Sequence, residues 1–148
     1  MFAHLGTFIH ERRLLNGEGF GKVDVDDYSN ILIETKSGAS LSFEISRFTY
    51  GRGNYQRMEI YGEKGALVYS LDRIPGVDEL ELCDETTDGK YVPLEIPEEF
   101  KVAQMQSYAD IILDKADGLS ATIEDGLKNQ ILLDAILESS EKGAWIEL

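Results

Sequence analysis

The chain has 148 residues, with 28 acidic residues against 14 basic ones and a formal net charge of -14. A chain of this length fits one domain, which buries roughly 68 to 70% of the surface that the unfolded chain exposes. The negative charge repels phosphate backbones and anionic lipid, which disfavours partnership with nucleic acid or a membrane surface. No run of about 18 apolar residues spans a membrane, and the first residues lack the pattern of a signal peptide. With a single cysteine, Cys83, and so no internal disulfide, we expect a cytoplasmic protein.

The first third of the sequence has the alternation of apolar and polar residues that is typical of strands. We expect strands over residues 2–9, 23–36 and 41–46. A loop is expected over residues 16–22, because three glycines in five residues disfavour regular structure. The turn at Ser37 and Gly38 should join the second and third strands into an antiparallel hairpin.

The middle of the sequence continues the same pattern. Further strands are expected over residues 57–61, 66–69, 79–83 and 91–96. A tight turn at residues 62–65 separates the first two, and a loop at residues 84–90 separates the last two, before Pro97 ends the run. Short strands with frequent turns predict a continuous, mostly antiparallel sheet.

From about Glu98 the apolar spacing changes to three and four residues, which is typical of amphipathic helices. The first predicted helix ends near Gly118 and has its apolar positions at Val102, Met105, Ala109, Ile112, Leu113 and Ala116. The second begins at Thr122, which forms a capping-box pattern with Asp125, and ends at Gly143. Its predicted buried stripe consists of Leu127, Ile131, Leu132, Ala135 and Ile136.

Residues 145–148 are expected to add a last short strand. Strands followed by helices predict an α+β fold: a mostly antiparallel open β-sheet with two C-terminal helices packed on one face. We find no internal repeat or linker, so residues 1–148 are expected to form a single domain.

The stretch LSFEISRFTYGRGNYQRMEIYGEKG, residues 41–65, places Arg47, Arg52 and Arg57 around glycines, an asparagine and tyrosines. Guanidinium groups donate several directed hydrogen bonds, and tyrosine offers a flat ring with a hydroxyl, so this loop suits a polar, hydroxyl-rich or anionic ligand. A solvated hairpin loop explains the same composition, and both interpretations stay open on composition alone.

Other motifs give weaker signals. The segment GEGFGKV at residues 17–23 is one residue short of the kinase glycine-rich loop and has no companion motif. Asp24, Asp26 and Asp27 lack the glycine and the distal glutamate of a calcium loop, so a solvated strand edge is favoured. His4 and His10 have no metal-ligand spacing. We therefore predict no metal site and no nucleotide site.

Several landmarks in fixed order resemble the C-terminal domain of the Gfo/Idh/MocA oxidoreductases, the relatives of glucose-fructose oxidoreductase and inositol 2-dehydrogenase. The landmarks are Asp26-Asp27-Tyr28, Gly38-Ala39, Ser46-Arg47, Gly51-Arg52-Gly53-Asn54, Glu59-Ile60-Tyr61-Gly62, Lys64-Gly65, Asp125-Gly126-Leu127, Ala135, Ser139 and residues 143–148. They extend over nearly the whole chain, and their combination is specific although each one alone is weak.

The resemblance implies a two-domain enzyme in which an N-terminal Rossmann domain holds NAD(P). The C-terminal domain then binds a sugar, inositol or related polyol and dimerises through its open sheet face. The Rossmann domain, the lysine of its E-K-P motif and the Asp-x-x-x-His helix have no counterpart in this sequence, and Met1 falls where the first sheet strand of the second domain begins. No catalytic and no cofactor-binding residue is therefore expected in this chain.

The resemblance also implies that the arginine loop contributes one wall of the substrate pocket. The substrate-binding candidates are Arg47, Tyr50, Arg52, Asn54 and Tyr55. The sequence thus predicts the substrate-binding and oligomerisation domain of an NAD(P)-dependent sugar or polyol dehydrogenase, inactive by itself. The alternative is a stand-alone, non-catalytic homodimeric interaction module. In either case we expect Leu32, Tyr61, Leu67 and Tyr69 on the uncovered sheet face.

Overall fold

The computed structural model describes residues 1–74, 76–101, 103–115 and 118–148. The chain separates into two compact units, which we describe one at a time. The first unit consists of Met1–Thr49 and Ala121–Leu148, and the second of Tyr50–Ser120. All strand pairings among the described residues are antiparallel, so the predicted α+β class with antiparallel sheets and two α-helices is confirmed. The pairings form three sheets, each within one unit, instead of one continuous sheet.

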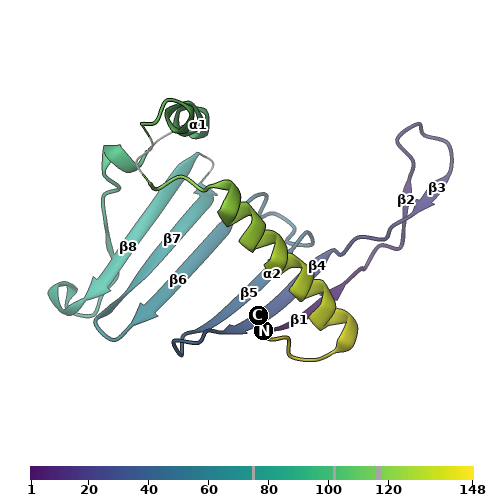
Figure 1. Cartoon of the computed structure of the whole chain (residues 1–148), viewed down its shortest axis with the longest axis horizontal. Coiled ribbons are helices and arrows are strands. Elements are labelled where there is room, and N and C mark those ends of the chain that lie inside the picture. Colours follow the sequence, from purple (N-terminus) through teal and green to yellow (C-terminus); the bar gives the residue numbers. More distant parts are fainter. Residues whose placement is uncertain (75, 102, 116–117) are drawn as a thin grey trace. The chain divides into compact units, whose positions relative to one another are not determined.

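The first unit is built on a three-stranded sheet in the order β1-β4-β5 (Figure 1). The strands are β1 (Phe2–Gly6), β4 (Tyr28–Glu34) and β5 (Ser40–Ser46). The predicted hairpin between β4 and β5 is confirmed. Its turn needs Gly38, whose φ of 89° is in the left-handed region, and the Thr35 hydroxyl accepts from the Ala39 amide at 3.0 Å.

Between β1 and β4 the chain forms a second hairpin, β2 (Glu11–Arg13) with β3 (Phe20–Lys22). The sequence analysis predicted a loop over residues 16–22 and a strand starting at Val23. Cross-strand pairing at Phe20, Gly21 and Lys22 extends regular structure into that loop. β4 in turn begins only at Tyr28.

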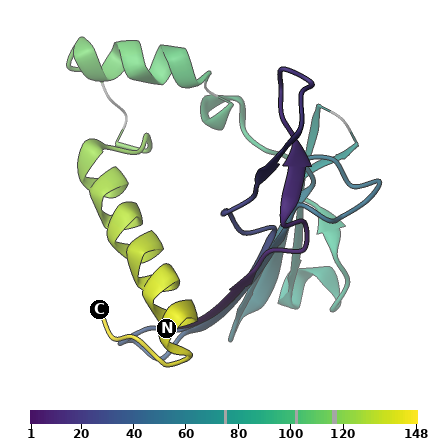
Figure 2. The same ribbon diagram turned by 90° about the vertical axis from the view of Figure 1, so that its right-hand side faces the viewer.

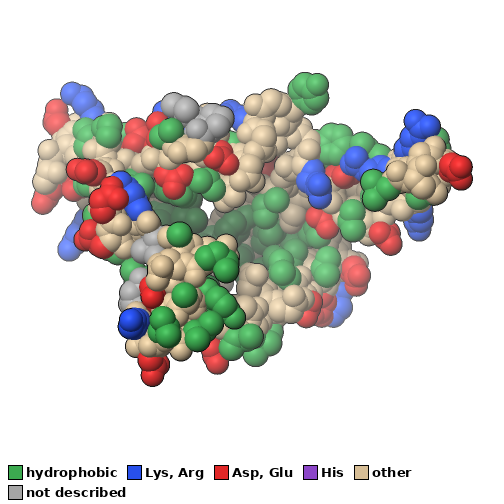
Figure 3. Space-filling view, turned by 90° about the horizontal axis from the view of Figure 1, so that it is seen from above, with side chains coloured by type: hydrophobic (Ala, Val, Ile, Leu, Met, Phe, Trp, Pro, Cys, Tyr) green, Lys and Arg blue, Asp and Glu red, His purple; other side chains and the backbone are tan. Residues whose placement is uncertain are grey.

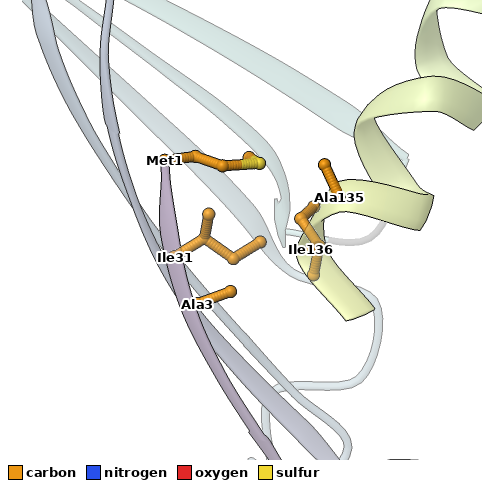
Figure 4. Close-up of a cluster of buried hydrophobic side chains, with 5 residues drawn as sticks. All are labelled: Met1, Ala3, Ile31, Ala135 and Ile136. Carbon is orange, nitrogen blue, oxygen red and sulfur yellow. The ribbon is translucent and has the colours of Figure 1, made fainter. Parts of the chain in front are cut away.

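The helix α2 (Ile123–Lys142) packs on one face of this sheet through its C-terminal half. Ala135 and Ile136 meet Met1, Ala3 and Ile31 in a small buried cluster (Figure 4). The predicted ends are confirmed, because Thr122 and Asp125 form the capping box and Gly143 adopts the left-handed C-cap. Of the predicted stripe, Leu132, Ala135 and Ile136 pack in this cluster, whereas Leu127 is 62% exposed and Ile131 is 49% exposed.

Two serines of α2 and the last residues of the chain fasten β1. The hydroxyls of Ser139 and Ser140 accept from the amides of Ala3 and Leu5 at 2.9 and 3.0 Å. The amide of Ile146 donates to the carbonyl of Met1 at 2.8 Å, and the amino group of Met1 donates back at 2.6 Å. Residues 145–148 are not assigned as the predicted strand, although this exchange extends the sheet edge by one residue pair.

The second unit is built on a four-stranded sheet in the order β6-β7-β8-β9. Its strands are β6 (Gln56–Gly62), β7 (Gly65–Ile74), β8 (Val77–Asp84) and β9 (Val92–Pro93). The tight turn between β6 and β7 is the predicted one. β8 pairs with both neighbours, and its pairing with β7 is broken by a bulge between Ser70 and Ile74.

Short helices complete the second unit. They are η1 (Glu85–Thr87), η2 (Glu98–Phe100) and α1 (Gln104–Ile112). α1 has no buried residue, and its predicted apolar positions Met105 and Ile112 are exposed. Two of its predicted apolar positions, Val102 and Ala116, lie outside the described residues.

The register of the four-stranded sheet gives its two faces different chemistry. One face is apolar and carries Met58, Ile60, Leu67, Tyr69, Leu80 and Leu82. The other carries Arg57, Glu59, Tyr61, Val68, Ser70, Glu79 and Glu81. Tyr61 therefore does not share a face with Leu67 and Tyr69 as predicted, because it pairs with Ala66 and side chains alternate along a strand. Leu32, in the first unit, lies on the sheet face opposite Ile31 and α2, as predicted.

Candidate functional site: the arginine and tyrosine loop

The loop that leads into β6 reverses the chain within a few residues. Its two glycines make this possible, because Gly51 and Gly53 have φ values of 85° and 59°, where a side chain would be strained. The amide of Tyr55 donates to the carbonyl of Arg52 at 3.2 Å and closes the turn. Tyr50, Arg52 and Asn54 are all exposed on this loop. The local sequence thus presents polar groups outward and keeps the backbone compact.

Arg52 and Tyr55 form the best-defined contact in the loop. The guanidinium carbon of Arg52 lies 4.9 Å from the centre of the Tyr55 ring, within the range of a cation–π interaction. A guanidinium over a ring face still has N–H donors at its edge that can reach a ligand. A planar cation beside an aromatic ring suits a ring-shaped, hydroxyl-rich ligand, which donates and accepts hydrogen bonds at its edge.

Asn54 is oriented by a residue that the sequence analysis missed. Its amide nitrogen donates to the carboxylate of Asp72 at 3.2 Å, which leaves the amide oxygen as an acceptor. Asp72 itself has a φ of 56° at the bulge of β7, and its second oxygen accepts from the Gly76 amide at 3.4 Å. A positive φ at a non-glycine residue marks an unusual backbone position. The role of Asp72 depends on this bulge, which the sequence pattern does not predict.

Arg57, the third arginine of the stretch, is already paired. Its guanidinium binds Glu59, and the hydroxyl of Tyr61 donates to the same carboxylate. The hydrogen bond to Glu59 raises the pKa of Tyr61 to about 12, so this phenol stays protonated at neutral pH. Arg57 is therefore engaged on the sheet face, whereas Arg52 forms no ion pair with any of the residues that the structure describes.

Arg47 belongs to the other unit and lies just after β5. Its amide donates to the carbonyl of Asp27 at 2.8 Å, and its guanidinium contributes to lowering the pKa of the Asp27 carboxyl. Of the five predicted substrate-binding residues, the second unit brings together Tyr50, Arg52, Asn54 and Tyr55, while Arg47 is positioned through Asp27.

Asp27 is buried, with 3% of its surface exposed, which differs from the solvated edge expected for the aspartates of this segment. The reason is its set of donors: its carboxylate accepts from the amides of Phe8 and Ile9 at 2.8 and 3.0 Å. Arg12 approaches the other oxygen at 3.6 Å. The hydrogen bond from Ile9 is the main cause of its lowered pKa, with Phe8 and the two arginines adding to it against the opposing effect of burial.

The residues of this chain do not fit a nicotinamide cofactor. A dinucleotide needs a glycine-rich turn between a strand and a helix, where amides at the helix N-terminus bind the pyrophosphate. The described glycines at 17, 19 and 21 lie in and beside a β-hairpin. Gly51 and Gly53 precede a strand instead of a helix. We therefore derive no step that passes through NAD(P) bound to these residues.

Other kinds of site receive little support. A shallow hollow of about 540 Å³ lies at the β6–β7 turn, lined by Ile60, Leu67 and Leu82 with charged residues at its rim, and it includes none of the five predicted residues. Within the described residues, no group of three histidine, cysteine, aspartate or glutamate side chains is arranged to hold a metal ion. The helices described are also too short or too polar to cross a membrane.

The described residues combine antiparallel sheets and two α-helices with a loop in which an arginine contacts a tyrosine ring. Residues 5–148 match the sequence pattern of the oxidoreductase family, C-terminal alpha/beta domain (GFO_IDH_MocA_C). The chain belongs to this family. The resemblance recognised in the sequence is thereby confirmed.

Individual relatives agree with this assignment. The chain is 29% identical to levoglucosan dehydrogenase of Pseudarthrobacter phenanthrenivorans, with 99% of this chain and 45% of the relative covered. A structure of levoglucosan dehydrogenase in complex with NADH and L-sorbose superposes with a TM-score of 0.77 at 31% identity, covering 98% of this chain and 44% of that one.

A crystal structure of an oxidoreductase domain protein from Kribbella flavida gives a TM-score of 0.76 at 28% identity and covers 99% of this chain and 43% of that one. The chain therefore spans less than half the length of each of these relatives.

Proposed function

We propose that this chain is the substrate-binding and oligomerisation part of an NAD(P)-dependent dehydrogenase of sugars or polyols. By itself it is inactive, because hydride transfer requires a nicotinamide held against the substrate carbon and an acid or base at the hydroxyl. Those groups belong to an N-terminal Rossmann domain on a partner or on the remainder of a longer chain. Cys83, the single cysteine, is compatible with a cytoplasmic setting.

The observation that carries the proposal is the contact between Arg52 and Tyr55 beside the oriented amide of Asn54. Guanidinium N–H groups donate to sugar hydroxyls, the amide oxygen accepts from them, and the tyrosine ring covers an apolar ring face. Membership in the oxidoreductase family and similarity to a dehydrogenase whose complex contains NADH and L-sorbose support the sugar or polyol class.

The oligomerisation part of the proposal is supported by the apolar face of the four-stranded sheet. Met58 and Ile60 are exposed there, and their cross-strand neighbours are only partly buried. Soluble proteins cover contiguous apolar faces of this kind with another surface. We propose a homodimer through this face. The same observation favours the second candidate, a non-catalytic interaction module in which the arginine loop binds no small molecule.

The test is reconstitution with a nicotinamide-binding domain from a relative, such as the N-terminal part of levoglucosan dehydrogenase. A panel of sugars, anhydrosugars and polyols is screened by the absorbance of the reduced nicotinamide. We expect turnover with at least one of them and an increase in KM of about tenfold in Arg52→Ala, since a lost charge-assisted hydrogen bond is worth 1.5 to 3 kcal/mol. Lys90→Ala, which removes an exposed cation elsewhere in the second unit, serves as the control.

The second candidate makes a different prediction for the chain alone. A ligand that binds the folded state raises its melting temperature, so an active substrate wall gives a sugar-dependent shift that Arg52→Ala abolishes. An interaction module gives no such shift with any sugar and no turnover after reconstitution. Both results together would replace the dehydrogenase assignment by the interaction module.

A further inference from the structure

The hairpin of β2 and β3 projects from the end of the three-stranded sheet as an arm, which we define as residues 10–22 (Figures 1 and 2). The arm is held by its own hydrogen bonds. The guanidinium of Arg13 donates to the carbonyl of Gly17 at 3.1 Å, and the amide of Leu14 donates to that of Gly19 at 3.1 Å. At its base the amide of Val23 donates to the carbonyl of His10 at 2.8 Å.

The surface of the arm is unlike the rest of the chain. It carries three basic residues, Arg12, Arg13 and Lys22, against two acidic ones, a formal charge of +1, so the other residues carry -15. It also presents two large apolar side chains, because Leu15 is 109% exposed and Phe20 is 70% exposed. Figure 3 shows basic, acidic and hydrophobic side chains at the projecting end on the right.

An isolated two-stranded hairpin is marginally stable in water, and large apolar side chains on it add unfavourable exposed surface. Within the described residues, the arm touches the remainder of its unit near its base, where Arg12 approaches Asp27 at 3.6 Å. A positively charged, apolar projection on a strongly negative protein therefore has the features of a segment that docks on another surface.

A complementary surface lies on the outward side of α2. Leu127, Ile131, Asp134 and Glu138 follow one another at intervals of four, three and four residues, which places them on one side of a helix. The first two are exposed apolar side chains and the last two are exposed carboxylates. Asp134 accepts from the side-chain amide of Gln130 at 2.8 Å and Glu138 pairs with Lys142 on the same helix, so each keeps one carboxylate oxygen for a further donor. The arm and α2 of one chain lie apart in both views (Figures 1 and 2).

We infer that the arm docks on the α2 stripe of a second copy of this chain. Leu15 and Phe20 cover Leu127 and Ile131, and the cations of the arm face Asp134 and Glu138. A second copy suits the arm because the residues outside the arm carry a formal charge of -15 on every copy, and this charge attracts the positively charged arm. This contact goes beyond the proposed function, whose dimer uses the four-stranded sheet of the other unit.

The first experiment measures self-association by sedimentation equilibrium in an Ile60→Glu background, which removes the proposed contact through the four-stranded sheet. The variant Leu15→Ser/Lys22→Gln changes two exposed side chains and places no like charge opposite Glu11, the cross-strand partner of Lys22. We expect it to raise the dissociation constant of the remaining contact about tenfold or more, as the loss of one apolar anchor at an interface does. The matched control is Leu113→Ser/Lys115→Gln, which makes the same changes at exposed positions of the second unit and leaves the constant unchanged.

The second experiment locates the contact. A photoreactive benzoylphenylalanine at position 15 is activated in a mixture of chains with light and heavy nitrogen isotopes, with the nicotinamide-binding domain of the relative present. Mixed-isotope crosslinks from position 15 to residues 123–142 support the proposal. Crosslinks within one chain, to another segment, or to the added domain overturn it, as does a wild-type protein that stays monomeric. Both experiments measure association between chains and not turnover. The contact of the arm can therefore be tested independently of the proposed dehydrogenase function.

Discussion

Asp27 shows how one side chain links the two parts of the first unit that matter for the site. Its carboxylate holds the amides of Phe8 and Ile9, and its carbonyl accepts from the amide of Arg47. The ring of Phe8 is thereby kept 4.8 Å from that of Tyr28 and 5.1 Å from that of Phe48. The start of the arginine loop is therefore tied to a buried charge.

Replacing Asp27 with asparagine removes that charge and tests its contribution. The pKa of Asp27 is lowered below 3.8 in the folded protein, so its stabilisation is fully present above that pH and is lost as the pH falls through the folded-state value. We expect Asp27→Asn to lower the melting temperature by several degrees at neutral pH and to reduce the loss of stability in acid. Thermal melts at a series of pH values measure both.

The neighbouring Asp26→Asn is the control for that change, because Asp26 is exposed. The melting temperature of this variant at neutral pH, and its loss of stability at low pH, should match those of the wild type. Equal effects of the two substitutions would mean that the hydrogen bonds around Asp27 do not stabilise the charged form.

At the scale of elements, Ser139 is the polar link between α2 and β1. It is fully buried, its hydroxyl donates to the Ala144 carbonyl at 2.7 Å, and it accepts from the Ala3 amide at 2.9 Å. In Ser139→Ala the buried Ala3 amide and the part-buried Ala144 carbonyl both lose their partner. We expect a loss of about 1 to 3 kcal/mol in the free energy of unfolding, the usual cost of a buried unsatisfied group.

Urea denaturation measures this loss, with Glu141→Ala as the control on the exposed side of the same helix. The control should stay within about 0.5 kcal/mol of the wild type. If Ser139→Ala unfolds at the wild-type urea concentration, water or backbone movement satisfies the two groups instead.

The ends of α2 could be predicted from capping residues, and strands could be predicted from alternation. Contacts between residues far apart in the sequence could not be predicted in this way. Thr122, Asp125 and Gly143 defined the ends of α2 because their roles depend on local backbone geometry. The exposure of Leu127 and Ile131 could not be predicted, since helical periodicity identifies an apolar stripe but not the surface that covers it.

The site divides in the same way. Its loop residues were predicted from composition and from the family resemblance, and their contact with a substrate stays a prediction. Asp72 was missed because it lies within a bulge, between Ser70 and Ile74, that alternation does not signal. The burial of Asp27 was missed because its donors, Phe8 and Ile9, are 19 and 18 residues away in the sequence.

At the scale of the whole molecule, the main feature is how much apolar surface the chain leaves exposed. Its compact hydrophobic cluster in the first unit contains Met1, Ala3, Ile31, Ala135 and Ile136. Large apolar side chains on β5, β6 and both α-helices remain exposed, and Figure 3 shows many hydrophobic side chains on the surface. A domain that normally meets other surfaces accounts for this distribution better than a self-sufficient one.

Adjacent positions on β6 distinguish which face of the four-stranded sheet forms the proposed homodimer. Ile60 belongs to the apolar face and Tyr61 to the charged one, so Ile60→Glu and Tyr61→Glu place the same carboxylate on opposite sides of one strand. We expect Ile60→Glu to weaken dimerisation about tenfold or more, because a charge would be buried without a partner, and Tyr61→Glu to leave it unchanged. Sedimentation equilibrium at micromolar concentrations makes the comparison.

If Tyr61→Glu weakens dimerisation and Ile60→Glu does not, the interface lies on the charged face, where Arg57 and Glu59 already pair. If the wild type is monomeric, the partner of the apolar face is instead the nicotinamide-binding domain. Adding that domain should then protect Ile60 from solvent.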